Sequence, residues 1–474
     1  MIAHTLLYNL ATIIAITVYC PMETNNKTNF KKFSQGYTFK ILMLIALVLL
    51  LLIPLSMIRG LIYERNRTAD SAEAEIMEAW GSQLMEAGPV IAIPGVRTEQ
   101  LRTKTERDGR TEEKIEEVKH PFTLVIMPRN LNIKADFTTE IRRRGIFSVP
   151  LFSGNLSLSG AFDPAEARSS LASNEELSFE KAELIIALSS QKGIRKIEKA
   201  QWNDQELFFQ PGNRGHNLFR KGSSGIYAAL PAFSGAQSVF DINIAIQGGQ
   251  LVRFLPVGQD THVEIAADWA SPSFQGSFLP GASTITDADF GAVWDISYLS
   301  RDIPLFWRSG DDSHEYTSSM FGVNFFRAID TYALNTRAVK YAILFLIIPF
   351  LTLFLLEVFT KKRIHPVPYL LAGIANIIFY LLLLSLSEQM QFYLAYLLTA
   401  LSVTVMMTLY SRSLLPSWNK SWYMGLVTTI SYVLLYAVLN AESYALLIGS
   451  IGAFLVVALV MYITRKLEWY GPDE

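Results

Sequence analysis

Six uncharged apolar runs limit what this chain can fold into more than any other feature. A helix needs about 20 mostly apolar residues to cross the hydrocarbon layer of a bilayer. One run precedes the long stretch from residue 60 to residue 336, and five follow it. We therefore predict a transmembrane helix over residues 41–59 and a five-span bundle over residues 337–466. The runs are residues 41–58, 341–356, 366–387, 392–411, 422–441 and 443–464.

The basic residues beside these runs predict how the chain is oriented, because short connections rich in Lys and Arg stay in the cytoplasm. Two connections carry a glutamate, Glu388 or Glu442, and no basic residue. Residues 1–40 and 467–474 are thus expected in the cytoplasm and residues 60–336 outside it. The basic positions that define the inner side are Lys27, Lys31, Lys32, Lys40, Lys361, Lys362, Arg363, Arg412, Lys420, Arg465 and Lys466.

The first 21 residues are mostly apolar and contain no lysine or arginine. They are similar to the apolar part of a signal peptide but lack its basic start. Three interpretations stay open: an over-long start with the true one at Met22, a segment at the membrane interface, or a further span.

Composition excludes several classes of protein. With one cysteine in 474 residues, the chain cannot form an internal disulfide framework, a Cys-based zinc site or an iron–sulfur cluster. Its 41 basic and 43 acidic residues argue against a nucleic-acid partner. Charged residues make up 18% of the chain, against about 25% in soluble proteins.

Residues 60–336 show mostly β patterns after a helix expected over 64–83. Short alternating or apolar runs between Gly, Pro and Asn are typical of an antiparallel, sandwich-type assembly. Residues 177–189 fit either a strand or a short helix. The charged residues 97–120 fit a solvated hairpin or loop rather than a binding arm, and residues 97–119 are the one stretch biased enough for disorder. The expected strands are 89–94, 122–127, 131–137, 156–160, 240–246, 251–257, 261–266 and 292–298.

No motif of enzyme chemistry is present: the chain has no phosphate-binding P-loop, no H-E-x-x-H and no G-x-S-x-G. The richest polar cluster, residues 311–315 (DDSHE), has donors for a divalent cation, but a turn before the membrane accounts for it as well. We therefore predict no catalytic residue, no cofactor and no metal.

Polar residues of the predicted bundle supply the candidate functional positions. His365 is either a pH switch or part of a helix start, since Pro366 follows it. Asn376 lies deep in the third span and is expected to hydrogen-bond a neighbouring helix. Glu388 is either a solvated loop charge or a contact to the outer domain. Pro349 predicts a kink, and the small residues Ala445, Gly449 and Ala453 predict a close packing face.

Several strings, in their order and spacing, resemble the CreD family of inner-membrane proteins linked to cell envelope integrity in Gram-negative bacteria. In the outer segment they are GPVI (88–91), RRGIF (143–147), FQG (274–276), AVW (292–294) and LSR (299–301). In the membrane half they include IDTY (329–332), FYLLLLSLSE (379–388) and YALL (444–447). The resemblance covers roughly residues 40–470 and implies one span, a large periplasmic domain and a bundle of spans.

Two positions depart from the family pattern. Pro368 stands where family members commonly have Gln, and Gln389-Met390 stand where they often place His. The resemblance implies links to colicin tolerance and to a β-lactam-related envelope response. It supplies no catalytic residue and no ligand.

The predicted fold class is an α+β membrane protein: a multi-span α-helical bundle with a large β-rich, sandwich-like extracytoplasmic domain. The predicted function is a non-enzymatic inner-membrane protein whose periplasmic domain binds an unidentified envelope protein, with the lipid bilayer as its other partner. One alternative is a channel or carrier whose outer domain receives the substrate. The intramembrane segments contain few ionisable groups, which disfavours it. An enzyme acting on envelope material ranks last.

Overall fold

The computed structural model describes residues 37–465 except 108–109, 213, 215–223, 232, 309–315, 326–330, 361, 415–417 and 442–443; side chains at 37–38, 102–114 and 418–420 are also outside the description. The interpretations of residues 1–21, of the cluster at 311–315, of Glu442 and of the tail 467–474 therefore lie outside the described residues. The chain forms two compact units. One comprises Met1–Thr68 and Ile329–Glu474, and the other Ala69–Ala328. The sequence-based boundaries were residues 60 and 336.

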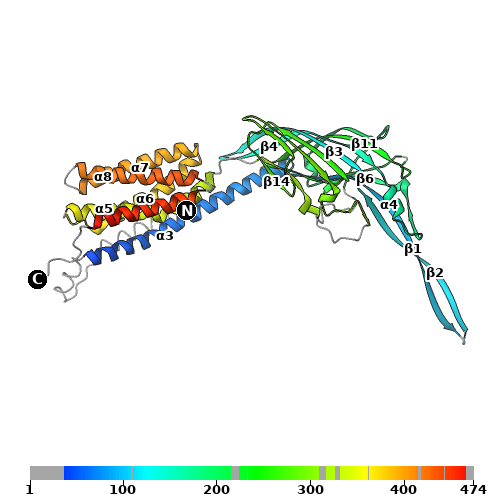
Figure 1. Cartoon of the computed structure of the whole chain (residues 1–474), viewed down its shortest axis with the longest axis horizontal. Helices are drawn as coiled ribbons and strands as arrows, with labels where there is room; N and C mark the ends of the chain where they lie inside the picture. Colours follow the sequence, from blue (N-terminus) through cyan, green and yellow to red (C-terminus); the bar gives the residue numbers. More distant parts are fainter. Residues whose placement is uncertain are drawn as a thin grey trace. The chain divides into compact units, whose positions relative to one another are not determined.

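The first unit contains, in its described part, six helices long and apolar enough to cross a membrane, which confirms the predicted number of transmembrane helices (Figure 1). Apolar residues occur all around each helix, as lipid and helix neighbours both require. Pro54 and Pro349 lie inside helices, and the kink at Pro349 stays a prediction. The helices are α3 (Tyr37–Trp80), α5 (Thr331–Thr360), α6 (Pro366–Ser387), α7 (Phe392–Leu414), α8 (Trp418–Asn440) and α9 (Ala445–Thr464).

Two glycines show where these helices pack closely. A Cβ on Gly373 of α6 would lie 2.2 Å from Leu51 of α3 and 2.8 Å from Phe350 of α5, so three helices meet there. The packing face predicted through Gly449 is wrong, because a Cβ at Gly449 would meet nothing within 4 Å. Instead Gly452 faces α8, where a Cβ would lie 2.9 Å from Leu434. Small-residue spacing identified the helix but not the face that its neighbour covers.

The second unit holds two β-sheets (Figure 1). The ten-stranded sheet has the order β14-β18-β12-β1-β6-β10-β9, with β2 and β5 beside β1 and β17 beside β2. Its strands are β1 (Leu84–Arg107), β2 (Arg110–Ile126), β5 (Glu175–Leu177), β6 (Glu183–Leu188), β9 (Gln210–Pro211), β10 (Ser224–Ala229), β12 (Leu251–Leu255), β14 (Pro272–Gly276), β17 (Phe306–Arg308) and β18 (Phe321–Phe325).

The eight-stranded sheet has the order β15-β16-β13-β3-β4-β11-β7-β8. Its strands are β3 (Asn130–Arg144), β4 (Phe147–Phe162), β7 (Ile194–Trp202), β8 (Gln205–Glu206), β11 (Ser238–Gly249), β13 (Asp260–Ala267), β15 (Ala282–Ile285) and β16 (Phe290–Ser297). A short helix, α4 (Ala165–Ser169), follows β4.

One hydrophobic core joins the two sheets. Along β3 buried and exposed residues alternate, so that Leu131, Ile133 and Ala135 point inward as predicted. Rings from opposite sheets meet in this core: the centroids of Phe152 and Phe325 are 5.3 Å apart. The helices and the two β-sheets together confirm the α+β membrane fold class.

The prediction of a purely antiparallel assembly is wrong at two places. β1 runs parallel to β12, with Leu84 opposite Val252, and β13 runs parallel to β3. Alternation along one strand shows which face is buried, but not which distant strand lies beside it. The stretch 177–189 also divides, into a 3₁₀ turn (Phe179–Lys181) and the strand β6.

Candidate functional site

A two-stranded ribbon formed by β1 and β2 is the most prominent feature of the β-rich unit (Figure 1). The two strands pair continuously from Ile91 opposite Ile126 to Arg107 opposite Arg110. The described residues between 97 and 119 therefore form the predicted hairpin. In the described part of the chain, β5 pairs with β1 only at its base, and β17 pairs with β2 only at its base. Two apolar side chains on the free part, Leu101 and Ile115, are 50% and 55% exposed.

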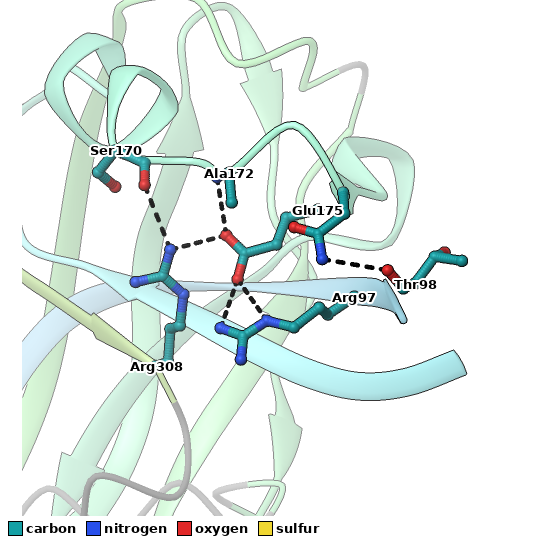
Figure 2. Close-up of polar contacts among 7 residues, drawn as sticks. Arg97, Thr98, Ser170, Ala172, Glu175 and Arg308 are labelled. Carbon is teal, nitrogen blue, oxygen red and sulfur yellow. Dashed lines mark hydrogen bonds and ion pairs between the residues drawn. The ribbon is translucent and has the colours of Figure 1, made fainter. Parts of the chain in front are cut away.

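The base of this ribbon is held by one carboxylate between two guanidinium groups, as Figure 2 shows. Arg97 of β1 pairs with Oε1 of Glu175 on β5, at an N–O distance of 2.6 Å. Arg308 of β17 pairs with Oε2 of the same carboxylate, at 2.8 Å. The backbone N–H of Ala172 also donates to Oε2, at 3.1 Å. The Glu175 side chain is 0% exposed. The Arg308 guanidinium, helped by Arg97, lowers the pKa of Glu175 to about 2.

A free two-stranded ribbon is marginally stable in water. An anchor at its base is therefore what lets the outer part stand away from the sheet. The backbone adds to that anchor, because the Thr98 N–H donates to the carbonyl of Asn174 and the Asn174 amide returns a bond to the Thr98 carbonyl. The cluster of Arg97, Glu175 and Arg308, called here the ribbon latch, joins three strands that are far apart in the sequence.

In the membrane unit, polar side chains gather at three levels along α6. At its N-terminal end, Lys40 of α3 forms an ion pair with Glu357 of α5. Tyr369 of α6 donates to the second oxygen of Glu357 at 2.8 Å. His365 is the N-cap of α6, and its Nδ1 accepts from the Val367 N–H at 3.4 Å, ahead of Pro366. The structure thus places His365 at a helix start.

At mid-length, Asn376 connects α6 to two other helices. Its amide donates to the carbonyl of Phe345 on α5 at 2.7 Å, and its oxygen accepts from the Tyr432 hydroxyl of α8 at 3.2 Å. Tyr396 of α7 donates to the Tyr432 carbonyl at 2.6 Å. The buried hydroxyl of Tyr380 has no hydrogen-bond partner among the described residues. Asn376 is therefore placed as an interhelical hydrogen-bond partner.

At the C-terminal end of α6, Glu388 accepts from the Tyr332 hydroxyl at 3.1 Å and lies 3.9 Å from the Arg65 guanidinium. The Glu388 side chain is only 12% exposed, so it is less solvated than an ordinary loop charge. Beside it, Asn335 donates to the Ser387 hydroxyl at 2.9 Å. These contacts stay within the membrane unit and join α3, α5 and α6.

Sequence reasoning missed the environment of two ionisable groups of the β-rich unit. Glu86 on β1 is fully buried, neither of its oxygens has a partner in the described structure, and burial raises its pKa well above the ordinary value. His262 lies between Asp295 at 2.6 Å and Glu264 at 3.2 Å, and both carboxylates raise its pKa. Its alternation with Glu264 was visible in the sequence, whereas the pairing with Asp295 on β16 was not. No group of residues suited to a metal ion occurs in the described structure.

The sequence of this chain is similar to that of known membrane proteins. The family model for the inner membrane protein CreD matches residues 36–470. The chain belongs to the CreD family. It is 29% identical to the inner membrane protein CreD of Escherichia coli (strain K12) over 435 residues, covering 91% of this chain and 94% of that protein. With its apolar helices, this membership makes it a multi-pass protein of the inner membrane.

Solved structures add nothing to the CreD assignment. An M1 zinc metallopeptidase from Deinococcus radiodurans bound to a Tyr-Ser-Ala substrate matches at 11% identity and a TM-score of 0.17, over 36% of this chain and 39% of its own. A two-domain M1 zinc metallopeptidase bound to L-arginine matches at 13% identity and a TM-score of 0.18, over 36% of this chain and 40% of its own. Likeness at this level carries no argument about fold or activity.

Proposed function

We propose that this CreD-family protein supports the integrity of the cell envelope without catalysing a reaction, by holding a partner protein with its β-rich domain. In this proposal both termini lie in the cytoplasm and residues 60–336 in the periplasm. The ribbon latch is the observation that carries it. Arg97 and Arg308 both pair with the carboxylate of Glu175, whose side chain is inaccessible to solvent. These ion pairs fix the base of the ribbon, whose outer part is held in the described structure by the pairing of β1 with β2.

The free part of the ribbon has the properties of a protein-binding arm. Its strand edges beyond Thr98 and before His120 are unpaired in the described structure, and strand edges bind extended segments of other proteins through backbone hydrogen bonds. Leu101 and Ile115 offer apolar contacts on opposite faces, because they belong to consecutive pairs of the ladder and successive residues of a strand point to opposite faces. By family resemblance, the process served would include colicin tolerance and a β-lactam-related envelope response.

Site-specific photo-crosslinking in intact cells tests the proposal. A photoreactive residue is placed at Leu101 or Ile115, and in a matched control at Phe208, which is 77% exposed on the same unit. We expect one discrete protein adduct from the ribbon positions and none of that size from Phe208. We also expect Glu175→Gln, which loosens the latch, to reduce the adduct several-fold at unchanged protein level. Equal adducts at all three positions would refute a binding role for the ribbon.

The orientation needs its own measurement. Membrane-impermeant thiol labelling of single cysteines, in a variant with Cys20→Ser, reports which side a position faces. We expect labelling in intact cells at Arg195→Cys in the β-rich domain and none at Arg363→Cys. The reverse pattern would overturn the periplasmic assignment.

The alternative function of a channel or carrier rests on the polar centre of the bundle around Asn376 and Tyr380. The side-chain nitrogen and oxygen of Asn376 each form a hydrogen bond to a neighbouring helix. The hydroxyls of Thr399 and Thr428 donate to carbonyls of their own helices. A cysteine at position 376 that reacts with small hydrophilic thiol reagents would favour the alternative, because it would show that water reaches this level.

A further inference from the structure

A pocket of about 230 Å³ opens beside the turn between β2 and β3. The apolar part of its lining, called here the floor, includes Met127 and Leu305, and its polar groups are Arg129, Asp163, Glu166 and Gln259. The space exceeds many times the roughly 10–15 Å³ that a cavity needs to hold one water, so it has room for a small organic molecule. That volume suits a molecule of the size of an amino acid or a dipeptide.

The polar groups of this pocket are of both signs. The Arg129 guanidinium lies 3.4 Å from one oxygen of Asp163, whose other oxygen accepts from the Ala165 N–H at 3.2 Å. Arg129 thus keeps further N–H donors for a ligand. In the described part of the chain, neither the Glu166 carboxylate nor the side-chain amide of Gln259 has a hydrogen-bond partner. The pocket therefore offers a cation, a free carboxylate and a free amide above an apolar floor.

A half-buried arginine, Arg301, contacts residues that line or adjoin the pocket. Arg301 donates to the carbonyls of Gly258 at 2.8 Å and Ile303 at 3.2 Å. It also lies 3.6 Å from the sulfur of Met127, which forms part of the floor. Burial lowers the pKa of Arg301 to about 10, so the guanidinium stays charged at neutral pH. Gly258 directly precedes Gln259, which lines the pocket. Arg301 therefore holds the backbone beside Gln259 and contacts Met127 of the floor. A site that is held in place before the ligand arrives favours binding.

We propose that this pocket binds a free amino acid or the end of a short peptide in its zwitterionic form. The ligand carboxylate pairs with Arg129, which is suited to planar carboxylates. The ligand ammonium pairs with Glu166, and Gln259 receives the polar groups between them. The apolar floor takes a small side chain. Arg301 is a positioning residue, since it acts through Met127 and Gly258. This inference is independent of the partner bound by the ribbon.

Calorimetric titration of the full-length protein in lipid nanodiscs tests the proposal, with L-alanyl-L-alanine as the probe. N-acetylated and C-amidated forms of the same dipeptide remove one charge each. We expect each modification to weaken binding at least tenfold. Arg129→Gln is expected to weaken binding of the unmodified dipeptide by a similar factor, and amidation should then have no further effect. In Glu166→Gln, acetylation should have no further effect. Arg195→Gln, an exposed arginine on β7, is the matched control and leaves binding unchanged.

Two further measurements make the outcome decisive. Ala165→Trp places a large ring at the pocket and is expected to remove binding, with an unchanged melting temperature showing that the domain is folded. Absence of binding by the wild type at millimolar dipeptide overturns the proposal. So does binding that Arg129→Gln, Glu166→Gln and Ala165→Trp all leave intact, because the peptide would then bind elsewhere.

Discussion

The ammonium of Lys40 forms an ion pair with the carboxylate of Glu357, across a sequence separation of 317 residues. Lys40 lies near the start of α3 and Glu357 near the end of α5, and the two side chains are 19% and 9% exposed. The hydroxyl of Tyr369 satisfies the second carboxylate oxygen. The first helix of the membrane unit is thus fixed to the later bundle by charge as well as by apolar packing.

Lys40→Met is expected to destabilise the membrane unit by about 3 kcal/mol, because it leaves the Glu357 carboxylate largely buried without its cation. The double variant Lys40→Met, Glu357→Met is expected to lose much less, since no uncompensated charge remains. Chemical unfolding in detergent micelles measures both. Arg363→Met, an exposed arginine of the α5–α6 connection, is the control. A double variant that loses as much as Lys40→Met would show that the loss does not come from an uncompensated Glu357 charge.

Glu175→Gln is expected to cost about 2 kcal/mol at neutral pH and to speed hydrogen exchange in the ribbon. Because Arg308 and Arg97 lower the Glu175 pKa to about 2, its contribution is complete above the ordinary carboxyl pKa and is lost as the pH falls toward 2. The full shift would correspond to about 3 kcal/mol, and the half-exposed Arg97 reduces it.

The matched control for this prediction is Glu176→Gln, the exposed neighbour in the same strand. It should leave ribbon exchange unchanged. In the wild type, the protection of the ribbon amides relative to intrinsic exchange should fall between pH 4 and pH 2, and in Glu175→Gln the protection should already be low at pH 7. Identical exchange in the two variants would contradict a role for the latch.

Glu86→Gln is expected to stabilise the β-rich domain at neutral and alkaline pH. Burial raises the pKa of Glu86, so the folded state binds a proton that the unfolded state releases. The contribution of Glu86 to wild-type stability is then greatest below the ordinary carboxyl pKa, and it falls by up to about 1.4 kcal/mol per pH unit as the pH rises toward the folded-state pKa. Thermal unfolding from pH 5 to pH 9 measures this slope.

The slope should be absent from Glu86→Gln and present in Glu206→Gln, whose carboxylate is exposed on β8. Glu86 lies opposite Leu188 of β6 and Phe254 of β12, within the apolar core. A wild type whose melting temperature does not fall more steeply with pH than that of Glu86→Gln would show that Glu86 is not a buried neutral acid.

The transmembrane helices could be predicted from the sequence because a lipid environment imposes one rule on every span. The expected run 366–387 coincides with α6 (Pro366–Ser387), and 443–464 nearly coincides with α9 (Ala445–Thr464). In the β-rich unit, alternation identified β3 and β11, where one face is buried and the other exposed. It missed short edge strands such as β14 and β17, which are too brief for a period to show.

The ribbon latch and the pocket could not be predicted because their members come from distant parts of the chain. Arg97, Glu175 and Arg308 are ordinary surface residues in the sequence, and only the pairing of β1 with β5 and of β2 with β17 brings them together. Burial of Glu86 was equally hidden, since a single glutamate before a glycine and a proline is typical of a turn. Asn376 was recognised because an amide inside an apolar span needs a partner.

Asn376→Leu is expected to destabilise the membrane unit by about 1–2 kcal/mol, because it leaves the Tyr432 hydroxyl and the Phe345 carbonyl without their partner. Tyr432→Phe removes the other half of one bond, and the double variant should lose less than the sum of the two single variants, by about 0.6 kcal/mol or more. Unfolding in detergent micelles measures the cycle. Asn440→Leu is the control, since the exposed Asn440 amide binds only the Tyr436 carbonyl of its own helix in the described structure. Strictly additive losses would mean that the Asn376–Tyr432 bond does not hold α6 to α8. The contact between these helices would then rest on packing, such as the stacking of Phe379 on Tyr432 with centroids 4.3 Å apart, which Tyr432→Phe retains.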